Sequence, residues 1–259
     1  MTNPLKAKFS AGQPVLGLWS VIPSATHAEV MGRAGLDFQI LDGEHGAFDL
    51  TALEHSIRAC ECGGCSPLVR VPGLNPNAIQ SALDLGAHGI VVPQVADLAT
   101  AQKAVAATRF PPLGNRGYNP FTRAAGYDPR RSDRLDNSFP LSAIIVETLG
   151  AYQDLEAIAA IEALDLVYLG IYDMAMALGC EGDVHHPKVD EFVDRSLAIL
   201  KAAGKPAGLL VHHPSEFQTW VDRGVLFLVY MVDTYVVGEA VSAFVTEFRQ
   251  AGQASGGPS

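Results

Sequence analysis

The chain has 259 residues, 48% of them hydrophobic, and a formal net charge of −10. A chain of this size can bury one large core, so a second domain is not required. The acidic balance argues against nucleic acid or an anionic membrane surface as the partner, because both need a basic face. An anionic small substrate must therefore be bound by local positive charge.

The sequence has no apolar run of about 18 residues, the length that a membrane-spanning helix needs. The first residues, Met1 to Lys6, lack the basic-then-apolar pattern of a signal peptide. These features predict a cytoplasmic protein that does not bind a membrane.

Strand-length apolar runs alternate with helical patterns along nearly the whole chain, which is typical of a parallel α/β fold. The predicted strands are residues 15–21, 38–41, 68–71, 89–92, 143–147, 166–170, 207–211 and 227–232. The predicted helices are residues 28–34, 50–59, 77–85, 98–107, 155–161, 189–203, 214–223 and 235–250. Eight such pairs in one chain predict a (β/α)8 TIM barrel, with a doubly wound sheet as the alternative. We assign residues 1–253 to this single domain and predict a disordered tail at residues 254–259.

Two segments interrupt the alternation, and we place both after strand ends. Residues 114–131 are polar and rich in Gly, Pro and Arg, which favours a lid or a subunit contact. Residues 179–187 carry His185 and His186 and lead into the next predicted helix.

Three of the four cysteines, Cys60, Cys62 and Cys65, lie within six positions. A zinc site is one interpretation, but the spacing does not fit paired C-x-x-C motifs and no His follows at ligand distance. Reduced thiols at a helix end are the simpler interpretation.

Polar residues gather at the carboxyl ends of the predicted strands, where the active sites of such barrels lie. The candidates are Trp19, Asp42, His45, Arg70, Gln94, Glu147, Asp173, His212 and His213. Taken together, their types suggest metal ligands, a base and an anion clamp.

Glu147 and Asp173 end or follow neighbouring predicted strands. Two carboxylates that converge at a barrel mouth repel each other unless a cation lies between them. Oxygen ligands without thiolates favour Mg²⁺ or Mn²⁺. The alternative is that these carboxylates cap helices or pair with arginines.

Arg70 lies in the otherwise apolar segment at residues 67–72. A guanidinium there needs a carboxylate or a substrate anion as its partner, and its fork suits a keto acid or an enolate oxygen. The alternative is a structural ion pair with Glu44 or Asp42.

His45 can carry a proton near neutral pH, and Asp42, three residues earlier, can orient it or share a water with it. A histidine in a turn is commonly without a function, but this one follows a buried strand.

The six lysines all lie away from the predicted strand ends, which argues against imine catalysis and leaves a metal to polarise the carbonyl. A G-x-G-x-x-G motif after a strand and a P-loop are also missing from the sequence, so dinucleotide and ATP chemistry have no support.

The order and spacing of several motifs resemble the HpcH/HpaI aldolases, metal-dependent class II pyruvate aldolases of the phosphoenolpyruvate/pyruvate barrel superfamily. The resemblance runs from Leu16 to Tyr230. The motifs that carry it are LDGEH at 41–45, VRVP at 69–72, LDLGA at 83–87, VVPQV at 91–95, RFPPLGNRG at 109–117, VET at 146–148 and GIYD at 170–173.

The resemblance implies a divalent metal on Glu147 and Asp173, chelated by the keto acid. It implies that Arg70 steadies the enolate oxygen and that backbone NH groups near Gly170, Tyr172 and Asp173 hold the carboxylate. His45, with Asp42 or Asp84, would shuttle a proton through water. Trp19 and Leu210 match positions that line the substrate pocket, and relatives form homohexamers, trimers of dimers that exchange their last helix, here about residues 235–250.

Two departures from the family pattern concern the substrate. Relatives usually carry Gln where this chain has Ile145, and a Pro-Ala-Asp-Leu-Ser-like segment where it has residues 171–175. The first departure removes a polar contact near the metal, and Tyr172 with Met174 changes the wall that meets the carboxylate.

The leading hypothesis is a lyase that cleaves a 4-hydroxy-2-oxo acid, or runs the reverse condensation, through a pyruvate or oxaloacetate enolate. The second is a citrate-synthase-like condensation of oxaloacetate with acetyl-CoA, as in siderophore-linked relatives; other members decarboxylate oxaloacetate. The third is a barrel that only binds a keto acid. The sequence leaves the acceptor and the roles of His212 and His213 open.

Overall fold

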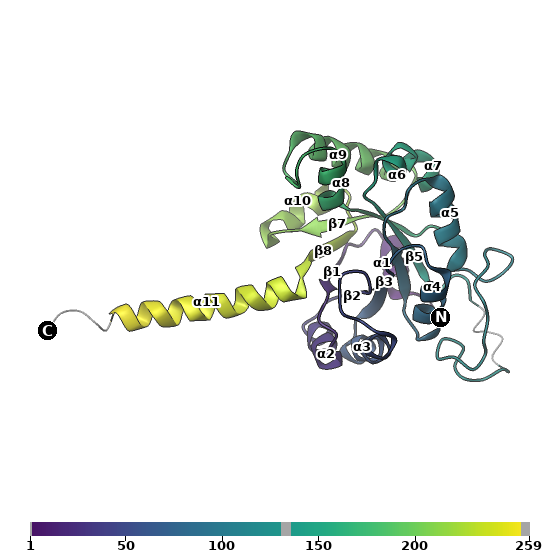
Figure 1. Cartoon of the computed structure of the whole chain (residues 1–259), viewed down its shortest axis with the longest axis horizontal. Coiled ribbons are helices and arrows are strands. Elements are labelled where there is room, and N and C mark those ends of the chain that lie inside the picture. The colour runs from purple at the N-terminus through teal and green to yellow at the C-terminus, as the bar shows by residue number, and fades with distance from the viewer. Residues whose placement is uncertain (1, 131–135, 255–259) are drawn as a thin grey trace.

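The structure is a computed structural model that describes residues 2–130 and 136–254. Its centre is a closed parallel barrel in which every strand pairs with its neighbour in chain order (Figure 1). The strands are β1 (Val15–Ser20), β2 (Phe38–Asp42), β3 (Ser66–Arg70), β4 (Gly89–Val92), β5 (Leu141–Val146), β6 (Leu166–Leu169), β7 (Ala207–Val211) and β8 (Phe227–Val232). The predicted (β/α)8 barrel is therefore confirmed, and the doubly wound alternative is wrong.

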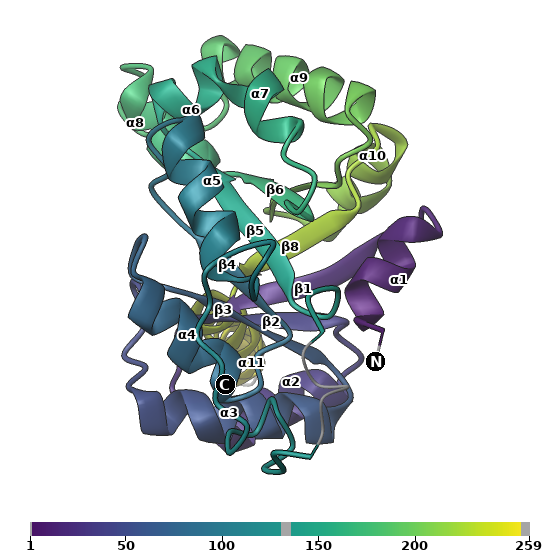
Figure 2. The same ribbon diagram turned by 90° about the vertical axis from the view of Figure 1, so that its right-hand side faces the viewer.

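Helices surround the barrel (Figure 2). The longer ones are α2 (Ala25–Arg33), α3 (Leu50–Gly63), α4 (Pro76–Asp84), α5 (Leu98–Ala107), α9 (Pro187–Ala202) and α11 (Asp233–Ala254). The shorter ones are α1 (Pro4–Ser10), α6 (Leu149–Gln153), α7 (Leu155–Ala159), α8 (Ile171–Ala177), η2 (Pro214–Glu216) and α10 (Phe217–Asp222). The sequence analysis did not foresee α1, α6 and α8, because two turns or fewer hold too few residues to show a helical period.

Helix α1 packs near the amino ends of the strands. Asn3 caps it, and the Asn3 amide also donates to the carbonyls of His88 and Phe139, both at 2.8 Å. Leu5 is buried in the apolar cluster inside the barrel, next to Phe9 and Phe227. This end of the barrel is therefore closed by side chains.

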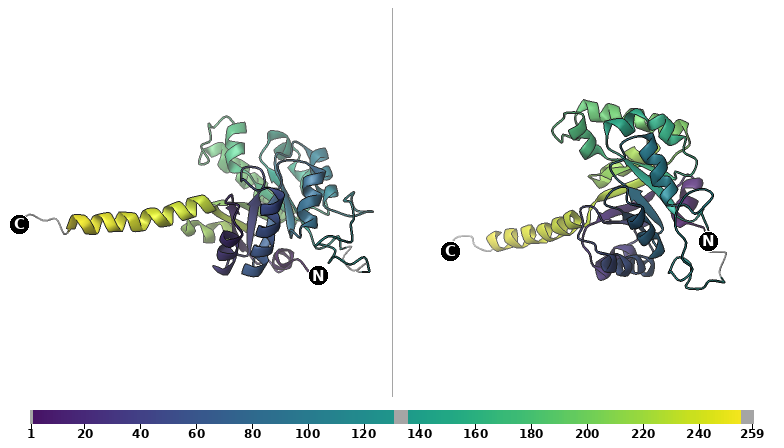
Figure 3. Two further views of the ribbon diagram at one scale, coloured as in Figure 1. Left: turned by 60° about the horizontal axis from the view of Figure 1, so that its bottom comes forward. Right: turned by 45° about the vertical axis from the view of Figure 1, so that its right-hand side comes forward.

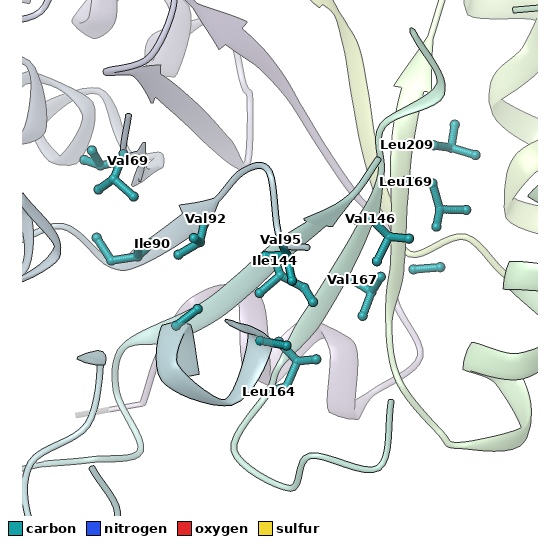
Figure 4. Packing of buried hydrophobic residues seen from close by; sticks show 14 of the residues in the cluster. Val69, Ile90, Val92, Val95, Ile144, Val146, Leu164, Val167, Leu169 and Leu209 are labelled. Atoms are coloured by element: carbon teal, nitrogen blue, oxygen red, sulfur yellow. The ribbon is translucent and has the colours of Figure 1, made fainter. Parts of the chain in front are cut away.

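The core has two parts. One lies between the strands and the surrounding helices and includes Val69, Val146 and Leu209 (Figure 4). The other fills the barrel and includes Ile145, which lies together with Trp19, Tyr168 and Leu210. Because side chains alternate along a strand, neighbouring residues such as Leu209 and Leu210 belong to different parts.

The segment at residues 114–131 connects α5 to β5, so our placement of it after a strand end was wrong. Helix α5 returns the chain to the amino ends of the strands. There the backbone NH of Ala124 donates to the carbonyl of Asp84, and Arg123 pairs with Glu61. This segment is consequently not a lid over its own barrel mouth, and its role as a subunit contact stays a prediction; residue 131 lies outside the described residues.

Helix α11 extends away from the barrel (Figures 1 and 3). It carries a stripe of exposed apolar side chains at Val237, Val241, Phe244 and Phe248, spaced four, three and four residues apart. That spacing places them on one helix face. The assignment of residues 1–253 to one domain stays a prediction. Of the predicted disordered tail at 254–259, residue 254 instead ends α11, and residues 255–259 lie outside the described residues.

Two of the clustered cysteines, Cys60 and Cys65, are buried and Cys62 is exposed, and all three are free thiols at the end of α3. Within residues 2–130 and 136–254, no helix combines the length and apolar character that crossing a membrane requires.

Candidate active site

Arg70 lies at the carboxyl end of β3 and contacts two carboxylates, that of Asp42 at the end of β2 and that of Glu44 in the turn that follows. Its Nε donates to Asp42 Oδ1 at 2.8 Å, and its Nη2 donates to Asp42 Oδ2. Its Nη1 lies 3.2 Å from Glu44 Oε2. The ion pair that we gave as the alternative for Arg70 therefore exists in the structure, and it places a fixed guanidinium at the barrel mouth.

Asp42 also shapes the turn that contains His45. Its Oδ1 accepts the backbone NH groups of Glu44 and His45, at 3.0 and 3.1 Å. Asp42 thus holds the backbone of His45, not its imidazole, which lies 3.9 Å from Glu44 Oε2 and is 68% exposed. The imidazole of His45 is therefore accessible to solvent.

Glu147 follows β5 and is buried, with 7% of its surface exposed. Its Oε1 accepts the backbone NH of Gln94 at 2.6 Å. Gln94 adopts the left-handed backbone region, with φ of 53°, and its side chain donates to Glu44 Oε1 at 2.9 Å. Gln94 therefore links the carboxylates of Glu44 and Glu147 across β4, a role that sequence analysis did not identify.

The end of β6 lies directly against Glu147. A Cβ on Gly170 would lie 2.7 Å from Glu147 Cβ, 2.8 Å from Glu147 Oε2 and 2.9 Å from Ile145 Cγ2, so only glycine fits this approach. Helix α8 begins one residue later and places the exposed Asp173 in its first turn. Gly170 thus allows the backbone that carries Asp173 to pass close to Glu147.

The mouth holds more negative than positive charge. Burial raises the pKa of Glu147 from 4.5 to about 7; the NH of Gln94 lowers it, Asp173 and Glu44 raise it, and Arg70 lowers it. Loss of solvent is the main cause, and the like charges of Asp173 and Glu44 add to it. A cation beside Glu147 would relieve both effects.

The wall of the mouth is aromatic on one side. Arg70 stacks over the Trp19 ring at 4.2 Å, and Trp19 Nε1 donates to Tyr168 Oη at 3.2 Å. Burial raises the pKa of Tyr168, so this phenol stays protonated. Leu210 and Ile145 belong to the same cluster inside the barrel, which gives the floor of the site an apolar surface.

Tyr172 and His212 meet at the ends of β6 and β7. Tyr172 Oη lies 2.8 Å from His212 Nε2, and the two rings form an edge contact with centroids 5.9 Å apart. The sequence analysis selected both residues but did not pair them, because they lie forty positions apart. His213 is instead the cap of η2 and accepts the NH of Ser215.

Asp84 is not part of this cluster. It ends α4, at the opposite end of the barrel, where it pairs with Arg116 at 2.7 Å. A cavity of about 690 Å³ lies at that end, and its lining includes Asp84, Arg116 and Arg123. The expected partnership of Asp84 with His45 is therefore not possible within one chain.

The donors at the mouth fit a hard divalent cation. Glu147 and Asp173 offer carboxylate oxygens, and the raised pKa of Glu147 indicates a place where positive charge is favourable. In the part of the chain that the structure describes, no three His, Cys, Asp or Glu residues cluster closely enough to form a complete ligand set. Two protein ligands with water and substrate oxygens are typical of Mg²⁺.

Fold and site together define a (β/α)8-barrel protein whose mouth presents carboxylates and the guanidinium of Arg70, an arrangement typical of an enzyme of this fold. The family model described as HpcH/HpaI aldolase/citrate lyase matches residues 15–239. The chain belongs to this family.

Two relatives illustrate the family. A hydroxypyruvate/pyruvate aldolase from Cupriavidus necator is 33% identical over 250 residues, covering 96% of this chain and 93% of the relative. A 5-keto-4-deoxy-D-glucarate aldolase from Salmonella newport is 34% identical over 244 residues, covering 93% and 92%.

Solved structures give the same result. An HpcH/HpaI aldolase/citrate lyase family protein from Burkholderia cenocepacia superposes with a TM-score of 0.91 at 31% identity, covering 96% of this chain and all of the other. The citrate synthase SbnG superposes with a TM-score of 0.87 at 28% identity, covering 96% and 99%. Membership of an aldolase and lyase family is thus confirmed.

The raised pKa of Glu147 predicts a pH-dependent stability in the presence of a chelator. The folded state binds this proton more tightly than the unfolded state, so the stabilisation is present below pH 4.5 and is lost as pH rises through about 7. Between pH 5 and 8, the unfolding free energy of the wild type should fall by up to about 3 kcal/mol relative to Glu147→Gln. Urea unfolding at both pH values measures this, with the exposed Glu156→Gln as control. If the unfolding free energy changed with pH equally in the wild type and in Glu147→Gln, the prediction would be contradicted.

Proposed function

We propose that the protein is a divalent-metal-dependent aldolase that forms the enolate of pyruvate or oxaloacetate. It cleaves a 4-hydroxy-2-oxo acid or catalyses the reverse addition. The observation that carries the proposal is that the carboxylates of Glu147, Asp173 and Glu44 lie with the guanidinium of Arg70 at one barrel mouth. An excess of carboxylates favours a bound cation, and a cation there would in turn provide positive charge for the oxygens of a keto acid.

Arg70 is the residue that stabilises the oxygen of the enolate. Asp42 holds Arg70 through Nε and Nη2. This leaves Nη1, which now faces Glu44, as the donor to the substrate carbonyl oxygen. A guanidinium fixed in advance stabilises developing negative charge without reorganising during the reaction.

The start of α8 binds the carboxylate of the substrate. The backbone NH groups of Tyr172 and Asp173 lie in the first turn, where helical NH groups are unpaired. The NH of Gly170 donates to the carbonyl of Val146 at 3.1 Å, so it is not available to the substrate. Trp19 and Leu210 form the wall and floor against which the substrate packs.

Glu147 and Asp173 would hold Mg²⁺ or Mn²⁺. When bound, the ion would polarise the keto group and neutralise the carboxylates. His45 moves the proton of the aldol hydroxyl at its imidazole, because its exposed ring can reach both the mouth and solvent.

The two aldolase relatives support a pyruvate-type donor, since the name of one includes pyruvate and both are aldolases.

The likeness to SbnG supports a second candidate, condensation of oxaloacetate with acetyl-CoA. Free thiol release from acetyl-CoA in the presence of oxaloacetate identifies that reaction. A barrel that only binds a keto acid would show neither reaction. The proposal also places the protein in the cytoplasm.

The apolar stripe of α11 supports an oligomer. Four exposed apolar side chains on a helix that leaves its own barrel suit burial against another subunit. We infer that copies of the chain exchange this helix in dimers, three of which form a hexamer. In such an assembly Asp84 can assist His45 only in the site of another subunit, because it lies at the far end of its own barrel.

Replacing Arg70 tests the proposed reaction. Arg70→Ala should lower kcat for aldol cleavage by about a hundredfold or more, the effect of removing oxyanion stabilisation. Arg70→Lys keeps one charge but cannot bind Asp42 bidentately, so it should retain a part of the activity. Thermal unfolding shows whether Asp42, left unpaired in the alanine variant, has destabilised the fold. Undiminished activity in a folded Arg70→Ala protein would rule out this role.

Replacing Phe244 tests the assembly. Phe244→Asp places a charge in the middle of the apolar stripe and should shift the protein to smaller species in sedimentation velocity. Ser242→Asp, two residues away and thus on another face of α11, should sediment as the wild type does. A wild type that is monomeric at micromolar concentration would overturn the proposal.

A further inference from the structure

A second cavity lies at the carboxyl end of the barrel, beside the proposed active site. Its volume is about 260 Å³, and it lies between the segment that joins α8 to α9 and the pair η2 and α10. Its lining side chains include Val184, His185, Val189, Val193, Thr219 and Trp220. This volume is smaller than the 300–1,000 Å³ or so of sites for drug-sized ligands, so it suits a short chain.

The cavity borders the mouth of the barrel. Leu210, which belongs to the apolar cluster inside the barrel, and Ile171, next to Gly170, both line it. His212 lines it as well, and Tyr172 fixes the His212 ring through the 2.8 Å bond to Nε2. The Tyr172–His212 pair thus connects the lining of the cavity to the turn that carries Asp173.

The chemistry of the cavity disfavours an anion. Its walls are largely aliphatic or aromatic, and its ionisable groups are two carboxylates, Asp190 and Glu216, and two imidazoles, His185 and His212. Burial lowers the pKa of His212; Glu216 raises it, and His185 lowers it. His212 in its neutral form provides no positive charge to bind an anion, and the carboxylate of Glu216 repels a negatively charged ligand.

We propose that this cavity is the acceptor subsite, which receives the uncharged, apolar tail of an aldehyde while the Tyr172–His212 pair positions its carbonyl end. This inference rests on the proposed aldolase function. In the addition, the methyl carbon of pyruvate loses a proton and bonds to the aldehyde carbon. The aldehyde oxygen takes up a proton, so the product is a 4-hydroxy-2-oxo acid and no redox partner is needed.

A matched pair of acceptors tests the charge preference. Butanal and succinic semialdehyde have four carbons each, and a methyl in the first replaces the carboxylate of the second. With pyruvate as donor, kcat/KM should be at least about tenfold higher for butanal. Glu216→Gln removes one negative charge with little change of shape, so it should raise kcat/KM for succinic semialdehyde about fivefold relative to kcat/KM for butanal. An unchanged ratio of the two would contradict the proposal.

A matched pair of variants tests whether the acceptor binds in this cavity. Thr219 is exposed on α10 and lines the cavity, whereas its neighbour Gln218 does not line it. Thr219→Trp fills the cavity, and Gln218→Trp is the control. The ratio of butanal addition to exchange of the pyruvate methyl protons with D₂O should fall about tenfold in Thr219→Trp and stay unchanged in Gln218→Trp.

The exchange reaction separates the two levels of the proposal, because it needs enolate formation but no acceptor. If the wild type shows no exchange, the proposed function fails, and the acceptor subsite fails with it. If exchange is present but succinic semialdehyde is preferred, or Thr219→Trp leaves the ratio unchanged, only the acceptor subsite is overturned.

Discussion

The site depends on an imbalance of charge at the barrel mouth. Asp42, Glu44, Glu147 and Asp173 lie there with the guanidinium of Arg70, and burial makes the charge of Glu147 the most costly. Arg70 is already committed to Asp42 and Glu44, so it compensates Glu147 only weakly. The arrangement is stable with a proton on Glu147 or with a cation beside it, and a cation is what the proposed chemistry needs.

Local geometry maintains this imbalance. Gly170 lets the start of α8 approach Glu147, Gln94 donates its backbone NH to the Glu147 carboxylate, and Trp19 covers Arg70. These contacts come from strands β1, β3, β4, β5 and β6, which only the closure of the barrel brings together. Because these contacts join groups of the protein itself, they orient the charged groups independently of the substrate, which is what electrostatic preorganisation requires.

The fold and the members of the site could be predicted from the sequence because both follow from a local rule: apolar runs form strands, and polar residues behind them face the mouth. That rule selected Arg70, Glu147 and Asp173, and Tyr172 was added by the family resemblance. It could not show that Tyr172 bonds to His212 or that Gln94 bridges two carboxylates, because such contacts depend on register and backbone angle. It also misplaced residues 114–131, and it could not show that Asp84 lies at the opposite end of its own barrel from His45, since a motif does not reveal which end of the barrel its residues occupy.

The two sides of the mouth divide the proposed reaction. Strands β3, β5 and β6 provide the groups for the keto acid, and β7 with its neighbours borders the apolar cavity for the acceptor. Ile145, where the family resemblance led us to expect Gln, belongs to the apolar cluster inside the barrel and agrees with an uncharged acceptor.

The most direct test of the central claim is exchange of the pyruvate methyl protons with D₂O, followed by NMR. The account predicts exchange with Mg²⁺ or Mn²⁺, its loss in EDTA, and its recovery when the ion is added back. Full exchange in EDTA would contradict the claim that the carboxylates of Glu147 and Asp173 act through a divalent cation.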